Sequence, residues 1–210
     1  MVACSQSTRE GGVNTTGGVG GWTVDGECVI LRNGVSVWIG PLATGDESSI
    51  ASWFAGLGPE TRYARFFSPL KRLDRRLQSA LAQVDHVDHE AIAARAWDRT
   101  TVGIARYIRF GQSRTAEVAV AVADDWTGRG IATILLDRVA MRACAVGIEH
   151  LAAVCLVRND RMIRLFRQLG GTTVGPSIAG IVEVSIDLTC PPDGRCGPAA
   201  GDEPSRAVAA

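Results

Sequence analysis

The stretch Ala116-Glu117-Val118-Ala119-Val120-Ala121-Val122-Ala123-Asp124-Asp125-Trp126-Thr127-Gly128-Arg129-Gly130-Ile131-Ala132-Thr133-Ile134-Leu135-Leu136 decides the fold of this 210-residue chain. Its valines alternate with small residues, which is the period of a β-strand. After the glycines at 128 and 130, apolar residues return with the spacing of a helix. The stretch therefore predicts a strand, a tight turn and an amphipathic helix. Backbone N–H groups at such a helix N-terminus can bind a phosphate or pyrophosphate group.

Two common phosphate-binding motifs do not fit this turn. A dinucleotide-binding loop has a third glycine, G-x-G-x-x-G, whereas this chain has Thr133 at that position. The ATP loop G-x-x-x-x-G-K-[ST] requires a lysine, and the single lysine of the chain, Lys71, lies far from the turn. A dinucleotide-binding domain is therefore disfavoured.

The segment Thr127-Gly128-Arg129-Gly130-Ile131-Ala132 resembles the acyl-CoA-binding motif [QR]-x-x-G-x-[GA] of the GNAT N-acetyltransferase family. Thr127 stands where that family has Gln or Arg. Residues 155–171 are similar to the family's second motif, a strand followed by an Asn, a short helix and a closing glycine. The resemblance covers about residues 28–188. Within the family, residues 58–67 and 84–91 look like the acetyltransferase domains of bacterial protein-lysine acetyltransferases.

The resemblance implies an α/β fold, a single GNAT-like acyl-CoA N-acyltransferase domain with a mixed, mostly antiparallel central sheet flanked by helices. It also implies acetyl-CoA as the cosubstrate. The thioester carbonyl would bind a backbone N–H near the middle of the strand, and the pyrophosphate would bind the turn. The expected cofactor-binding residues are Val120, Ala121, Val122, Thr127, Gly128, Arg129, Gly130, Ile131, Ala132 and Asn159.

Glu117 is the candidate general base. Acetyl transfer to an amine requires removal of a proton from an ammonium group whose pKa is ordinarily about 10.4. Glu117 lies on the strand face opposite the valines, among alanines, and partial burial there would raise its pKa to a useful value. The protein acetyltransferases that the chain resembles have a strand glutamate at the matching place. The alternative is an exposed glutamate paired with an arginine such as Arg106.

Two residues of the second motif matter for the chemistry. Asn159 can cap the following helix, and in the family the matching Asn also contacts the CoA arm. Phe166 stands where many family members have a tyrosine that protonates the leaving thiolate. Because phenylalanine has no proton to donate, solvent or the ammonium must do so, or the chain is a weak catalyst. An N-acetyltransferase acting on a protein lysine or a small amine is therefore expected, and a non-catalytic acyl-CoA sensor is the alternative.

The composition of the chain argues against nucleic acid and membranes as binding partners. The formal net charge is zero, so no electrostatic footprint for nucleic acid is expected. No apolar run approaches the length of a membrane span and the N-terminus lacks the pattern of a secretory signal, so a cytoplasmic protein is expected. Neither the acceptor nor the oligomeric state can be read from the sequence.

No metal site is expected. The pair His86 and His89 has metal-like spacing, but a polar loop is favoured because no third His is near. Cys28, Cys144 and Cys155 lie in apolar surroundings and are expected to be small core residues with reduced thiols.

The chain is expected to have three parts: a disordered leader (1–22), the acetyltransferase domain (23–189) and a flexible tail (190–210). Asn33-Gly34 predicts a hairpin between strands 28–31 and 35–39. Helices are expected after Asp46, after Pro59, over 73–84, up to Val146 and over 159–169. Strands are expected over 91–97, 101–110, 115–123 and 151–157, followed by two strands on either side of Gly175-Pro176.

Overall fold

The computed structural model describes residues 26–189 and 197–198. The expected leader, residues 1–22, lies outside the described residues, as does almost all of the expected tail. The domain boundaries therefore stay predictions.

A single mixed sheet organises the molecule, with strand order β1-β2-β3-β4-β5-β6-β8-β7 and the short β9 paired with β8. Every neighbouring pair is antiparallel except β5 and β6, which are parallel. The predicted mixed, mostly antiparallel sheet flanked by helices is thus confirmed. The strands are β1 (Glu27–Ile30), β2 (Ser36–Pro41), β3 (His89–Arg95), β4 (Thr101–Arg109), β5 (Thr115–Val122), β6 (His150–Leu156), β7 (Thr172–Ile178), β8 (Ile181–Thr189) and β9 (Gly197–Pro198).

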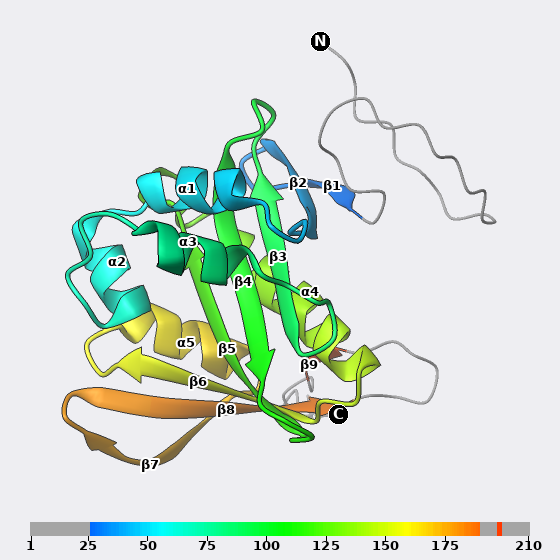
Figure 1. Ribbon diagram of the computed structural model, residues 1–210. Helices are drawn as coiled ribbons and strands as arrows, with labels where there is room; N and C mark the ends of the chain where they lie inside the picture. The colour runs from blue at the N-terminus through cyan, green and yellow to red at the C-terminus, as the bar shows by residue number, and fades with distance from the viewer. Residues whose placement is uncertain (1–25, 190–196, 199–210) are drawn as a thin grey trace, which may run out of the picture.

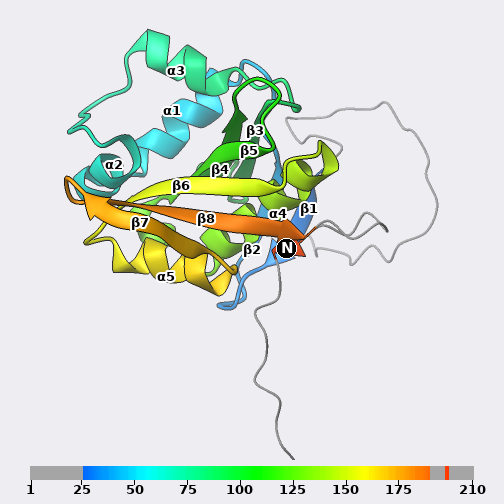
Figure 2. The same ribbon diagram turned by 90° about the horizontal axis from the view of Figure 1, so that it is seen from below.

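Helices cover both faces of the sheet, as Figures 1 and 2 show. On one face lie α1 (Glu47–Ala55), α2 (Pro59–Phe66) and α3 (Arg75–Ala82). On the other lie α4 (Ile131–Ala145) and α5 (Asp160–Gln168). The alternation in β5 assigns its side chains to these layers: the valines at 118, 120 and 122 pack in the core with α4, and Ala121 packs with α1.

The helix starts follow local capping rules. The Asp46 carboxylate accepts a hydrogen bond from Ser49 N–H at 3.0 Å, and Asn159 Oδ1 accepts one from Met162 N–H at 3.2 Å. Pro59 occupies the first turn of α2. Gly147, with φ of 79°, follows the end of α4. The hairpin at Asn33-Gly34 and these helices are confirmed within one or two residues.

Two expectations are wrong. Gly175-Pro176 does not separate the last two strands: both residues lie within β7, where the pairing with β8 shifts register between Val174 and Ile178. The turn instead uses Ala179 and Gly180, at φ of 52° and 78°, which is the conformation that a two-residue hairpin requires. A Gly-Pro pair can interrupt an edge strand as well as end it.

The cysteines are the second correction. Cys28 and Cys144 are disulfide-bonded, not reduced as expected, although Cys144 lies in the core, as expected. Cys155 is free and buried, as expected.

In the described part of the chain, no helix is long and apolar enough to cross a membrane.

Candidate functional site

A cleft of about 1130 Å³ opens where β5 and β6 separate. The two strands pair only over Thr115–Glu117 and His150–Ala152. Beyond that point no β6 residue is in register with β5, so one edge of β5 from Val118 to Val122 faces the cleft. The walls come from α2, the turn before α4, β6 and α5.

The glycine turn forms the wall next to the α4 N-terminus. Gly128 and Gly130 have φ of 78° and 88°, a left-handed conformation that glycine adopts without strain. Gly130 caps α4 without any side-chain hydrogen bond, and the bond from Ile134 N–H to Gly130 O begins the helix. The amides of residues 131–133 therefore have no intrahelical acceptor, and these three residues line the cleft. Such an N-terminus binds anions.

Nine of the ten expected cofactor-binding residues line the cleft, together with Glu117. The exception is Arg129. Its guanidinium lies 4.7 Å from the centre of the Trp126 ring and donates to Asp125 O at 2.8 Å. Asn159 lines the cleft while its oxygen caps α5, so only the capping role is visible in the hydrogen bonds.

Glu117 stands at the point where β5 and β6 part. Its side chain is exposed, not partly buried. Arg106 is not its ion-pair partner either: Arg106 Nη1 donates to Leu81 O at 3.0 Å. The expected partial burial of Glu117 is therefore wrong. Of the alternative, the exposure is confirmed and the pairing with Arg106 is not, and the function of Glu117 as a base stays a prediction.

Arg65 of α2 approaches the same region. It lines the cleft and is half-buried. Burial, reinforced by the positive charge of Arg106, lowers the pKa of Arg65 to about 10, and the negative charge of Glu117 opposes that shift. Arg106 is itself 5% exposed. Arg106 does not line the cleft, but its positive charge acts on Arg65 there.

The position of α2 depends on Asp124, just after β5. Asp124 accepts a hydrogen bond from Thr61 Oγ1 at 2.7 Å, and its N–H donates to Gly56 O at 3.0 Å. A Cβ atom on Gly58 would lie 2.2 Å from Asp124 Oδ2, so a larger residue at position 58 would displace the Asp124 carboxylate. These contacts hold the start of α2 against the end of β5 and place Arg65 over the cleft.

The α5 side carries further cations. Arg158 lies 5.5 Å from the centre of the Tyr63 ring on α2. Arg161 lies 3.8 Å from the position that a Cβ atom on Gly128 would take. Phe166 is 2% exposed, packs in the core and also lines the cleft. Sequence reasoning missed the arginines at 158 and 161 as site residues, because an arginine-rich chain gives no signal that separates them from surface arginines.

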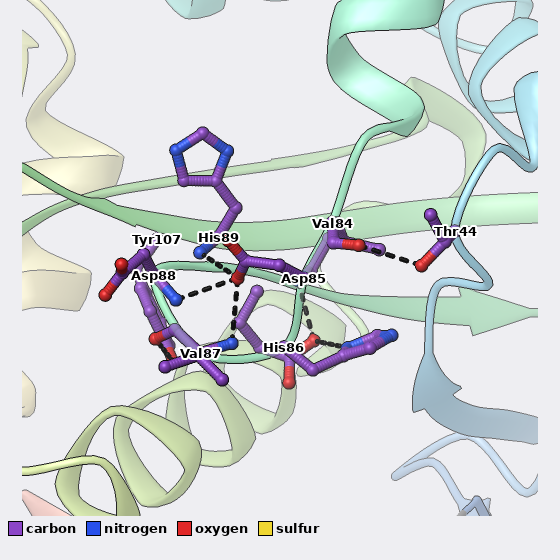
Figure 3. Close-up of polar contacts among 10 residues, drawn as sticks. Thr44, Val84, Asp85, His86, Val87, Asp88, His89 and Tyr107 are labelled. Atoms are coloured by element: carbon purple, nitrogen blue, oxygen red, sulfur yellow. Dashed lines mark hydrogen bonds and ion pairs between the residues drawn. The ribbon is translucent and has the colours of Figure 1, made fainter.

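The segment with His86 and His89 is a structured turn. Figure 3 shows the Asp85 carboxylate accepting hydrogen bonds from the N–H groups of Val87, Asp88 and His89 at 2.9, 2.8 and 2.8 Å. His86 Nδ1 lies 2.9 Å from Glu90 Oε1. Among the residues that the structure describes, no group of three or more His, Cys, Asp or Glu side chains is placed to hold a metal ion.

The sequence of this chain is similar to those of known acetyltransferases. The sequence model described as "Acetyltransferase (GNAT) family" matches residues 57–170, which include α2 and the whole stretch from β3 to α5. "Acetyltransferase Pat" of Mycolicibacterium smegmatis is 31% identical over 167 residues, which are 76% of this chain and 48% of that protein. This chain thus spans about half the length of that relative. "Acetyltransferase PA5475" of Pseudomonas aeruginosa is 29% identical, over 67% of this chain and 77% of the relative.

Among solved structures, the GNAT domain of S. lividans PAT superposes with a TM-score of 0.73 at 31% identity. The match covers 78% of this chain and 97% of that domain.

Proposed function

This chain belongs to the GNAT acetyltransferase family, and from that premise we propose that it transfers an acetyl group from acetyl-CoA to a primary amine, with a protein lysine as the acceptor. The observation that carries the proposal is the cleft at the divergence of β5 and β6, which joins an uncapped helix N-terminus to an exposed glutamate. The similarity to the two acetyltransferases and to the PAT domain supports it.

The CoA arm is assigned to the backbone. The pyrophosphate binds the free N–H groups at the start of α4, and the thioester carbonyl binds an N–H of β5 within 120–122. Gly128 and Gly130 allow the turn to present its amides without a side chain in the way. Arg161, beside Gly128, adds a positive charge near the phosphates.

The transfer itself needs one proton acceptor. We assign Glu117 to take the proton of the acceptor ammonium, directly or through a water molecule. The free amine then attacks the thioester carbon, the C–N bond forms and the C–S bond breaks. The thiolate leaves without a proton from Phe166, which its ordinary pKa of about 8.5 permits, and is protonated by solvent.

The test is turnover of acetyl-CoA with lysine peptides by wild type and Glu117→Gln. Loss of the base lowers kcat by about a hundredfold or more, and raising the pH restores part of the rate because more of the amine is already free. Glu183→Gln is the matched control, since Glu183 is also an exposed strand glutamate but lies away from the cleft. Equal rates for Glu117→Gln and wild type at every pH would disprove the assignment.

A second candidate, an acyl-CoA sensor without catalysis, is favoured by one observation: a core phenylalanine at position 166 in place of an acid. It predicts tight acetyl-CoA binding and no release of CoA with any amine. A small-molecule amine as acceptor is separated from a protein lysine by comparing free amines with lysine peptides in the same assay.

A further inference from the structure

Arg65 is a cation without an anion. The structure gives its guanidinium no hydrogen-bond acceptor within the described residues, although the side chain is half-buried. None of its nitrogens is sealed from solvent, in contrast to Arg62 Nε and Arg106 Nε. The guanidinium carbon lies 5.0 Å from the centre of the Phe66 ring. Because arginine stays charged and its nitrogens reach solvent at the cleft wall, its donors are available to an anionic group from outside the chain.

The neighbours of Arg65 do not supply that group. Arg106 lies behind it and lowers its pKa further. Arg106 is held by the Leu81 carbonyl, not by a carboxylate. The acidic side chain within electrostatic range is Glu117, which forms no ion pair within the described chain. The negative charge of Glu117 acting on Arg65 is thus opposed by the positive charge of the buried Arg106.

The location excludes the CoA phosphates as the missing anion. Arg65 lies in the last turn of α2 and lines the cleft within electrostatic range of Glu117, where β5 still pairs with β6, whereas the turn proposed to bind phosphate begins at Thr127, beyond the other end of the strand. Along a strand, residues rise about 3.3 Å each, so the two ends of this stretch of β5 are well separated. Arg65 therefore faces the reacting groups.

We propose that Arg65 binds a carboxylate carried by one of the two substrates. The proposal rests on the acetyltransferase function above and names the substrate class that the site prefers. A planar guanidinium binds a carboxylate through two parallel hydrogen bonds. The carboxylate has two possible sources: the acyl group, as in a succinyl thioester, or the acceptor, as an acidic residue next to the target lysine.

The experiment has one arm for each source. The first compares acetyl-CoA with succinyl-CoA at a fixed neutral lysine peptide. The second uses acetyl-CoA with peptides in which an Asp or Glu beside the lysine is exchanged for Asn or Gln. Wild type prefers the carboxylate-bearing substrate in one arm by about tenfold or more in kcat/KM, the range of a charged hydrogen bond.

Substitutions test whether the preference for a carboxylate-bearing substrate depends on Arg65. Arg65→Gln abolishes it and Arg65→Lys keeps part of it, while Arg76→Gln, an exposed arginine of α3 outside the cleft, leaves it unchanged. Equal kcat/KM for both members of each pair, or a preference that survives Arg65→Gln, overturns the inference.

Direct binding keeps this test separate from the proposed function. Affinities of the same CoA esters and peptides are measured without turnover. If acetyl-CoA does not bind, or no amine releases CoA, the acetyltransferase proposal fails. If binding of a carboxylate-bearing substrate still depends on Arg65, the inference about Arg65 stands alone.

Discussion

The indole Nε1 of Trp53 donates a 3.0 Å hydrogen bond to the backbone carbonyl of Ala121. Trp53 belongs to α1 and is 2% exposed, and Ala121 lies in the part of β5 that has lost its β6 partner. The bond therefore ties a helix of one layer to the strand segment that is assigned to hold the thioester. The position of α1 and the shape of the cleft edge depend on one another.

Trp53→Phe tests this coupling. The substitution leaves the buried Ala121 carbonyl without its partner, which costs about 1–3 kcal/mol in the free energy of unfolding. It also loosens β5 at the cleft and raises the KM for acetyl-CoA. Urea unfolding and steady-state kinetics measure the two effects. Trp97→Phe is the control, because Trp97 is 67% exposed and its replacement changes stability by less than about 0.5 kcal/mol. Similar stabilities for the two variants would contradict the expected coupling.

Local patterns made much of the fold predictable. The alternating valines of β5 placed one face of the strand in the core, and they are 2–8% exposed. Asp46 and Asn159 marked helix starts because a short side chain that accepts a backbone N–H acts within three residues. The glycine turn identified one wall of the cleft for the same reason, since its φ angles are local properties.

The features that the sequence did not predict depend mostly on contacts between segments that are distant in the chain. The approach of Arg65 to Glu117 joins residues on α2 and β5 and follows from Asp124 holding the start of α2, which no periodicity encodes. The exposure of Glu117 depends on what packs over its face of the sheet, which the pattern of one strand does not show. The turn at Ala179-Gly180 escaped notice because alanine at φ of 52° is an unusual choice, whereas Gly-Pro is a frequent turn signal.

The Asp85 carboxylate stabilises the folded protein at neutral pH, and this contribution to the free energy of unfolding is lost at acid pH. Hydrogen bonds from the N–H groups of His89, Val87 and Asp88 lower the pKa of Asp85 below its ordinary value. A carboxylate with a lowered folded-state pKa stabilises the protein above its unfolded-state pKa, about 3.9, and that contribution disappears as the pH falls through the folded-state value. Asp85→Asn therefore reduces stability at about pH 7 and has little effect once both forms are uncharged.

Urea unfolding of wild type and Asp85→Asn at neutral and acid pH measures this difference. Asp125→Asn is the control, because the exposed Asp125 carboxylate accepts no hydrogen bond within the described chain. A constant gap between wild type and Asp85→Asn across the whole pH range would show that the carboxylate charge has no part in the turn.

Cys155 should resist alkylation in the folded protein. It is 3% exposed, and burial raises its pKa to about 11. Relative to an ordinary thiol, the reactive thiolate at about pH 8 is lower by roughly a hundredfold or more. Iodoacetamide labelling with peptide mapping is expected to show slow modification of Cys155 in native protein and fast modification in urea. Fast labelling without denaturant would mean that β6 opens at the cleft.

Alanine substitutions at Gly130 and Gly111, both at positive φ, distinguish the effect of backbone strain on stability from an effect on acetyl-CoA binding. Alanine at either position must adopt a left-handed conformation, at φ of 88° and 62°, which costs about 1–2 kcal/mol. No atom lies within 4 Å of a Cβ added at either site, so direct steric clash is absent in both. Gly111→Ala, in the hairpin between β4 and β5, lowers only stability. Gly130→Ala lowers stability by a similar amount and also raises the dissociation constant for acetyl-CoA, because relief of the strain turns the amides at the start of α4 away from the pyrophosphate. Calorimetric titration with acetyl-CoA measures the dissociation constants of the two variants. Equal affinities would contradict the assignment of the pyrophosphate to this turn.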